Sequence, residues 1–199
     1  MKTFFVILIL LVSFSCIKVD SIHTSSSQNL SVGANSNTGS LRTTWTEDWD
    51  RWTFDWGSET GIFRTNFTED WDNWQFTYEG INGDVRTSFT EDWDQWVLTS
   101  SDGYNVKIRT TFHEDYDSWE LTDGTNGISI RVRTSFTNDF DNWDAIYEGS
   151  NVIDLKTTYR EDWDRWTING EIDVPNAHKA AILFIGVFTG ALKQQGIVD

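Results

Sequence analysis

Apolar and polar residues alternate with a period of two along most of the chain beyond residue 40. In the first such stretch, Thr43 and Trp45 precede an acidic cluster, and Trp52 and Phe54 follow it on the same side of the alternation. This pattern is typical of antiparallel strands that bury one face. We predict a hairpin that turns over residues 47–50, with Trp45 opposite Trp52 and Thr43 opposite Phe54.

The same unit occurs six times, each time after a basic residue followed by threonine. These anchors are Arg42-Thr43, Arg64-Thr65, Arg86-Thr87, Arg109-Thr110, Arg133-Thr134 and Lys156-Thr157, at spacings of 22, 22, 23, 24 and 23 residues. Each anchor leads into an aromatic residue, an acidic cluster and a tryptophan. Repetition of this kind indicates one supersecondary unit per repeat. In the predicted register, Trp45, Phe67 and Phe136 face the apolar side of their hairpins.

Six hairpins give twelve strands, and closure of the sheet would remove its two edges. We therefore predict an all-β fold, a closed antiparallel up-and-down barrel over residues 41–174. A barrel wider than about eight strands is not filled by its own side chains. The segment 175–199 contains a helix that is apolar on all sides from Ala180 to Leu192, with Asn176 as its N-cap. We predict that this helix fills the barrel.

The C-terminal segment resembles the superfamily of tubby, phospholipid scramblase and LURP-one-related proteins. The resemblance rests on Asp173-Val174, on Lys179-Ala180 and on the apolar run at 182–186. It implies a twelve-stranded barrel closed around a C-terminal hydrophobic helix. The near-identical repeats differ from that superfamily, and the chain shows no basic phosphoinositide patch. We therefore take the fold from the resemblance and keep lipid binding as an alternative.

Residues 1–20 have the pattern of an export leader, with Lys2 before a short apolar run. Cys16, the one cysteine, directly follows that run and resembles the lipidated cysteine of a Bacteroidetes-type lipoprotein signal. The alternative is an ordinary secretory signal that is cleaved elsewhere, for example after Ser21. Residues 21–40 are rich in Ser, Asn, Thr and Gly, which predicts a flexible tether. The expected location is the cell envelope or outer membrane through a lipid anchor, or secretion.

The formal charge of −16 argues against nucleic acid as a partner, because that binding needs a basic surface. It also disfavours an anionic membrane surface. The three histidines, His23, His113 and His178, have no partners at catalytic or metal-binding spacing, and no glycine-rich phosphate loop is present. We predict a protein that is not an enzyme and has no cofactor, with Ca²⁺ as the one alternative.

The acidic clusters offer two aspartates in every repeat. These are Asp48, Asp50, Asp70, Asp72, Asp92, Asp94, Asp115, Asp117, Asp139, Asp141, Asp162 and Asp164. Carboxylates are the ligands that Ca²⁺ prefers, and one cation would relieve the crowding of negative charge. The alternative, which we prefer, is that the aspartates form turns with their own backbone, because no cluster has EF-hand spacing.

One aromatic residue lies within each acidic cluster: Trp49, Trp71, Trp93, Tyr116, Phe140 and Trp163. If exposed, these side chains would suit stacking on sugars, and if folded inward they would cap the barrel end. The leading hypothesis is a binding or structural module of the cell envelope with a glycan or protein partner. A carbohydrate-binding protein that uses the loop aromatics and a scramblase-like or tubby-like lipid-binding protein are the alternatives.

Overall fold

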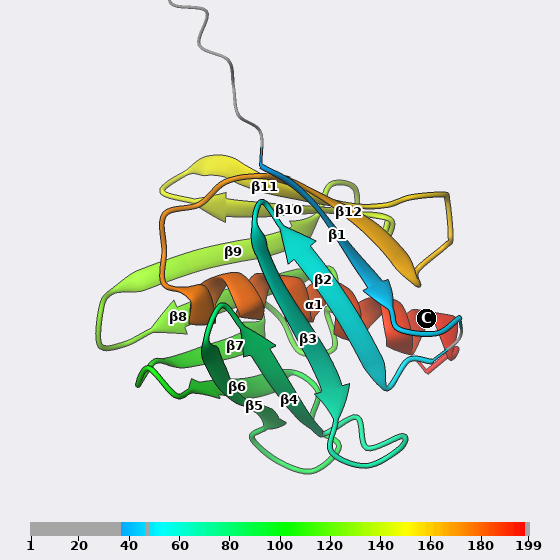
Figure 1. Ribbon diagram of the computed structural model, residues 1–199, viewed down its shortest axis with the longest axis horizontal. Coiled ribbons are helices and arrows are strands. Elements are labelled where there is room, and N and C mark those ends of the chain that lie inside the picture. Colours follow the sequence, from blue (N-terminus) through cyan, green and yellow to red (C-terminus); the bar gives the residue numbers. More distant parts are fainter. Residues whose placement is uncertain (1–36, 47, 198–199) are drawn as a thin grey trace, which may run out of the picture. The chain divides into compact units, whose positions relative to one another are not determined.

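The computed structural model describes residues 37–46 and 48–197. Twelve strands form a closed antiparallel barrel in which each strand pairs with its neighbours along the chain and β1 pairs with β12 (Figure 1). The strands are β1 Thr38–Thr43, β2 Arg51–Trp56, β3 Glu59–Thr65, β4 Asn73–Tyr78, β5 Ile81–Thr87, β6 Gln95–Ser100, β7 Asn105–Thr110, β8 Ser118–Asp123, β9 Ile128–Thr134, β10 Asn142–Tyr147, β11 Ser150–Thr157 and β12 Arg165–Gly170. The predicted all-β barrel of six hairpins is confirmed.

The inner wall of the barrel is built mainly from aromatic and branched apolar side chains. Its largest members are the tryptophans near the start of each even-numbered strand: Trp52, Trp74, Trp96, Trp119, Trp143 and Trp166. All six are at most 1% exposed. A buried aromatic side chain removes roughly 150–250 Å² from water, so this ring of tryptophans supplies a large part of the apolar stabilisation.

The hairpin register differs from the prediction by two residues. Trp52 lies opposite Thr43, not opposite Trp45. Because side chains alternate with a period of two, the inward face of each strand is unchanged by this shift. The connection takes seven residues and not four, so Trp45, Phe67 and Phe136 lie beyond the strands and are 71–74% exposed. The prediction that these three side chains face the interior is wrong.

One helix, α1 Asn176–Gln194, runs through the barrel (Figure 1). Every residue from Ala180 to Leu192 is buried, which confirms that the helix fills the space within the strands. The N-cap position falls on Pro175, and no side chain caps the helix there. The backbone N–H of His178 instead donates to the carbonyl of Pro175 at 2.9 Å. The assignment of Asn176 as N-cap is therefore wrong, because the chain enters the helix one residue earlier.

The helix packs large residues against one part of the wall and small residues against another. The Phe184 ring lies 5.1 Å from the Trp96 ring and 5.9 Å from the Phe63 ring, measured between centroids. Elsewhere on the helix, a Cβ atom added to Gly190 would lie 3.0 Å from a ring atom of Trp166. This difference fixes the rotation of the helix within the barrel, because turning it would bring large side chains against the tryptophan that now faces glycine.

Strand β1 begins at Thr38, so residues 38–40 belong to the sheet and not to the predicted tether. The pairing of Thr38 with Asn169 of β12 holds this end in the ladder. The leader, the rest of the tether and Cys16 lie outside the described residues. Within the part of the chain that is described, no helix is long and apolar enough to cross a membrane.

Candidate binding site at the loop rim

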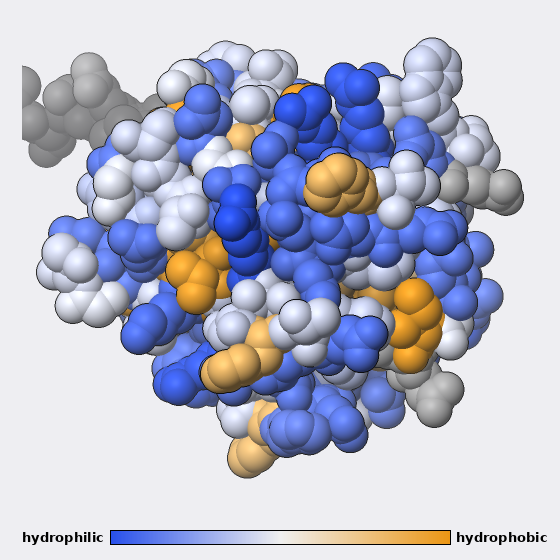
Figure 2. Space-filling view, turned by 90° about the horizontal axis from the view of Figure 1, so that it is seen from below, coloured by the Kyte–Doolittle hydropathy of each residue, from blue (hydrophilic) through white to orange (hydrophobic). Residues whose placement is uncertain are grey.

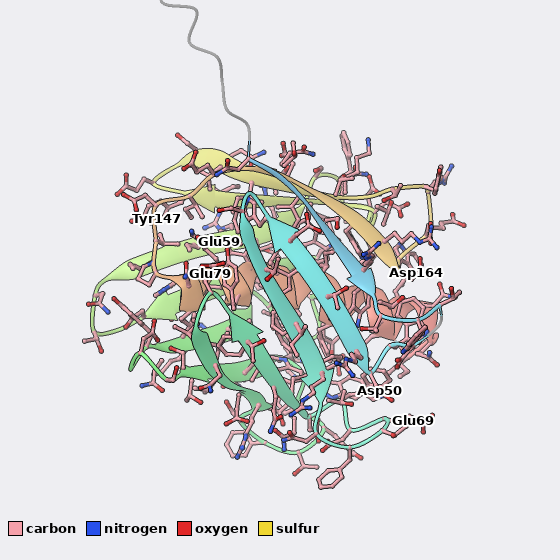
Figure 3. The ribbon with its side chains drawn as sticks, viewed as in Figure 1. Asp50, Glu59, Glu69, Glu79, Tyr147 and Asp164 are labelled. Carbon is pink, nitrogen blue, oxygen red and sulfur yellow. The ribbon has the colours of Figure 1, made fainter. Side chains whose placement is uncertain are left out.

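Six loops of seven residues lie at one end of the barrel, and we call them the loop rim. They are residues 44–50, 66–72, 88–94, 111–117, 135–141 and 158–164. Each joins an odd-numbered strand to the next even-numbered strand, and the odd-numbered strands all run in the same direction. Figure 3 shows Asp50, Glu69 and Asp164 at this end, whereas Glu59 and Glu79 lie toward the opposite end.

Each loop is shaped by successive tight turns. In the second loop, the N–H of Asp70 donates to the carbonyl of Phe67 at 3.0 Å, and the N–H of Asn73 donates to the carbonyl of Asp70 at 3.4 Å. Glu69, between them, has a φ of 61°. The equivalent residues of four other loops share this left-handed geometry, at 59–61°: Glu91, Glu114, Asn138 and Glu161. Left-handed backbone costs a non-glycine residue roughly 1–2 kcal/mol, so surrounding contacts must hold it.

The contacts that hold it come from the second aspartate of the preceding loop. We call the second aspartates of the six loops the bracket aspartates: Asp50, Asp72, Asp94, Asp117, Asp141 and Asp164. Oδ1 of Asp94 accepts hydrogen bonds from the Thr110 hydroxyl at 2.9 Å and from the N–H of Glu114 at 2.9 Å. The backbone carbonyl of every bracket aspartate accepts a hydrogen bond from a backbone N–H of the next hairpin. The carbonyl of Asp164, in the last hairpin, accepts the N–H of Thr43 in the first at 3.0 Å, so the bonds run around the whole barrel. The bracket aspartates therefore join neighbouring repeats.

The first aspartates of the loops have a turn geometry. Oδ1 of Asp92 accepts the N–H of Asp94 at 3.3 Å, and Oδ1 of Asp115 accepts the N–H of Asp117 at 3.4 Å. Among the described residues, no three His, Cys, Asp or Glu side chains are placed to hold a metal ion. The twelve aspartates considered as Ca²⁺ ligands thus lie in one ring, but their oxygens are directed largely to backbone and side-chain donors of the loops.

Hydrogen bonding, burial and neighbouring carboxylates raise several pKa values at the rim. A hydrogen bond with Asp164, together with burial, raises the pKa of Asp162 to about 6. Burial, with the charges of Asp94 and Glu114, raises the pKa of Tyr116 to about 12. Burial also raises the pKa of Asp117. The charge of a neighbouring carboxylate contributes to each of these shifts.

The aromatic residues predicted as ligand contacts fold toward the barrel: Trp49, Trp71, Trp93, Tyr116, Phe140 and Trp163. Trp49 and Phe140 are 7% and 5% exposed, and the other four are partly buried against the core. The carbonyl of each accepts the indole N–H of the buried tryptophan three residues later. Trp93 also donates its own indole N–H to Asp72 at 2.9 Å. This packing corresponds to the capping alternative.

A different set of six aromatic side chains points into solvent, and we call them the rim aromatics: Trp45, Phe67, Phe89, Phe112, Phe136 and Tyr159. Each is the second residue of its loop, and all are 68–74% exposed. The alternation of apolar and polar residues predicts this position inside the barrel, and that prediction is wrong. The threonine two residues before each rim aromatic already lies opposite the buried tryptophan of the next strand. The rim aromatic therefore falls beyond the paired strands and is exposed. Apolar groups on the face shown in Figure 2 form separate patches within hydrophilic surface.

At the opposite end of the barrel, His178 is completely buried at the start of α1. Its Nε2 atom lies 3.7 Å from Oδ2 of Asp123, and its ring packs edge-on against Tyr104. Burial lowers the pKa of His178, although the negative charges of Asp123 and Asp102 act in the opposite direction. Burial in the barrel interior therefore favours the neutral form of the ring.

The described histidines lie far apart in the fold. His113 belongs to the loop rim, where its Nε2 atom lies 3.5 Å from Oδ2 of Asp94 and its side chain is 81% exposed. His178 lies at the other end of the helix. His23 is outside the described residues. The two described histidines therefore do not form a shared site.

Comparisons with protein-family models, with curated proteins and with solved structures found no match for this chain.

Proposed function

We propose that this chain is a non-catalytic binding module that holds carbohydrate at its loop rim. The observation that carries the proposal is the set of six rim aromatics, equivalent in position and 68–74% exposed. Aromatic faces stack on the apolar faces of sugar rings, and ionised carboxylates accept hydrogen bonds from sugar hydroxyls. Exposed carboxylates stand two residues after a rim aromatic in four loops: Glu69, Glu91, Glu114 and Glu161.

Six equivalent contacts favour a ligand that itself repeats, such as a polysaccharide. A single exposed aromatic side chain gives a weak contact, but linked contacts act at a high effective concentration. The closed barrel fixes the loops relative to one another because each bracket aspartate binds the next hairpin. The rim is therefore organised before any ligand arrives, which lowers the entropic cost of binding.

Other ligand classes fit this rim less well. Anionic lipid surfaces and nucleic acids would meet the carboxylates that crowd this rim in a chain whose formal charge is −16. A stable protein partner usually covers a continuous apolar patch, whereas the apolar groups on the one face that Figure 2 shows are separated. Kinship with the tubby and scramblase superfamily remains a proposal supported by the barrel around a terminal helix, and lipid binding is not adopted from it.

We further propose that the protein is exported and acts at the cell envelope or outside the cell. The leader pattern of residues 1–20 and the position of Cys16 after its apolar run support this. Substitution Cys16→Ser should release the protein from the membrane fraction of cells. A native N-terminus at another residue, or unchanged fractionation, would instead support secretion after cleavage elsewhere.

The carbohydrate proposal is tested with the purified protein on a glycan array. The variant Phe67→Ala/Phe89→Ala/Phe112→Ala should lose at least tenfold in affinity for any glycan that the unaltered protein binds, which is about 1.4 kcal/mol. Its melting temperature should change little, because these side chains are exposed. The matched control is Thr60→Ala/Thr77→Ala on the outer wall, which should bind normally. Absence of glycan binding, or binding that the triple variant retains, would reject the proposal.

A further inference from the structure

A cavity of about 620 Å³ opens between the fifth and sixth loops and reaches the end of α1. We call it the basic niche, because three cationic side chains line it: Lys156, Arg160 and Lys193. Three carboxylates also line it: Asp139, Asp141 and Glu161. Equal numbers of positive and negative groups are unusual at the rim of a chain whose formal charge is −16.

Two of these carboxylates are already occupied by donors of the protein. Oδ1 of Asp141 accepts hydrogen bonds from the Thr157 hydroxyl at 2.9 Å, the N–H of Glu161 at 2.8 Å and the indole N–H of Trp163 at 3.0 Å. Oδ2 of Asp139 accepts the side-chain amide of Asn142 at 2.8 Å. These bonds hold the two carboxylates to the loops but leave their negative charges in the niche, so a ligand carboxylate would depend on direct contact with the lysine and arginine side chains.

The ammonium groups of the niche are available to a ligand. The Nζ atom of Lys193 lies 5.0 Å from the centre of the Phe140 ring, in a cation–π contact at the last turn of α1. Neither Lys156 nor Lys193 forms an ion pair with a described residue. In the part of the chain that the structure describes, Arg160 forms one ion pair, with its exposed neighbour Glu161 at 3.6 Å.

Two sequence changes distinguish the basic niche from the rest of the rim. Arg160 stands where four of the other loops have threonine and one has His113. Asn138 stands where the other loops have glutamate, and it keeps the left-handed backbone with a φ of 61°. One change adds a positive charge and the other removes a negative charge, while the loop geometry stays the same.

The niche between the first and second loops provides a comparison within the same molecule. Its volume is about 330 Å³, and its lining includes Asp48, Asp50 and Glu69 but no lysine or arginine among the described residues. Among the described residues of that lining, the charged side chains that an anionic group would meet are all negative, whereas the basic niche offers three cations beside its three carboxylates.

We infer that the basic niche binds the carboxylate of an acidic sugar within a polysaccharide chain, between Lys156, Arg160 and Lys193. This inference rests on the proposed carbohydrate function and makes it specific. A cavity of this volume accommodates a sugar ring, and Trp163 in its lining provides an aromatic surface. The anionic group sets the register of the polysaccharide on the rim, while the rim aromatics contact its neutral parts.

The test uses calorimetric titration of the purified protein with a trisaccharide of galacturonic acid and with the same trisaccharide fully methyl-esterified. The acid should bind at least tenfold more tightly than the ester, and this preference should shrink as salt is raised. In Lys156→Gln/Arg160→Thr the acid should lose at least tenfold and the ester should not change. The matched control is Arg133→Gln, at the position equivalent to Lys156 in the preceding hairpin, and it should keep the preference.

Equal affinity for the acid and the ester, or an acid preference that survives in Lys156→Gln/Arg160→Thr, would overturn the inference. If neutral glycans bind and the rim-aromatic variant loses them, the proposed function stands while the inference fails. If the acid binds through the niche and the rim-aromatic variant retains its binding to every glycan on the array, the niche stands while the rim proposal fails. Absence of binding to either trisaccharide and to the glycan array would reject both.

Discussion

Trp52 donates its indole N–H to the backbone carbonyl of Trp49 at 2.9 Å, and both side chains are buried. The equivalent bond occurs in all six hairpins, at 2.8–3.0 Å. The bond joins the backbone of each rim loop to a buried tryptophan of the inner wall of the barrel. The loop can therefore present a rim aromatic to solvent without collapsing onto the core.

We predict that Trp74→Phe lowers the free energy of unfolding by about 1–3 kcal/mol, because the carbonyl of Trp71 loses its donor. Loss of ring volume in the tightly packed wall adds to this. Urea denaturation measures the change. Phe67→Ala in the same hairpin is the control and should stay within about 0.5 kcal/mol, since its side chain is 74% exposed. Similar losses in the two variants would contradict the assignment of inner and outer positions.

The fold could be predicted because several independent features of the sequence agree. The period of two predicts strands, and six copies of a hairpin predict an even number of strands. The apolar segment that ends at Leu192 has no polar face, which predicts a buried helix. These features lead to a barrel with a filled centre, and the inward positions such as Trp52 and Phe54 follow from the alternation alone.

The loop rim could not be predicted because its geometry depends on backbone that the sequence does not mark. Glu69 adopts a φ of 61°, a conformation that glutamate rarely takes, and nothing in its neighbours indicates it. Because the left-handed residue was not foreseen, each hairpin turn was predicted too far along the chain. Trp45 was consequently expected inside the barrel, whereas Trp49, for which both exposure and inward capping were considered, caps the barrel end.

We predict that Asp94→Ala destabilises the protein by at least about 2 kcal/mol. It removes the charged acceptor of the Thr110 hydroxyl and of the N–H of Glu114, and hydrogen bonds to charged groups contribute about 1.5–3 kcal/mol each. Asp92→Ala, two residues earlier, should cost less than about 1 kcal/mol because Asp92 makes one long bond at 3.3 Å. Denaturation of both variants in urea checks the order, and the reverse order would refute the bracket role.

We predict that millimolar Ca²⁺ raises the melting temperature by less than about 2 °C. The aspartates of the rim serve turns and brackets, and no metal-binding group is present among the described residues. A cation at 100 times its dissociation constant would add about 2.7 kcal/mol, which corresponds to several degrees for a protein of this size. A rise of that order, reversed by a chelator, would show that the rim is a metal site.

We predict that acid weakens the folded state through His178. Burial lowers its pKa below the unfolded value of about 6.5. Below that pH the unfolded state binds more protons than the folded state, so this contribution to stability is present above about pH 6.5 and is lost as the pH falls toward the folded pKa. Asp123 acts in the same direction at lower pH: burial alone would raise its pKa, but hydrogen bonds from Asn126 and Thr125 lower it overall.

The measurement is the melting temperature at pH 7.5 and at pH 5.5 in the unaltered protein and in His178→Gln. Other carboxylates titrate in both proteins, so the difference between them isolates the histidine. The variant should lose less stability on acidification than the unaltered protein. An equal loss in both would mean that His178 does not titrate differently in the folded and unfolded states.

The last prediction concerns Phe184, which is 1% exposed and lies between Trp74, Trp96 and Phe188. Phe184→Asp should abolish folding, because burying an unpaired carboxylate costs several kcal/mol, comparable to the whole stability of a domain at roughly 5–15 kcal/mol. Phe184→Leu keeps most of the volume and should cost far less, so it shows whether charge or shape is decisive. Circular dichroism and urea denaturation measure both. Removal of residues from 177 onward should leave an aggregating sheet, since the aromatic wall would lose its cover. A truncated protein that stays soluble and melts cooperatively would mean that the strands close without the helix.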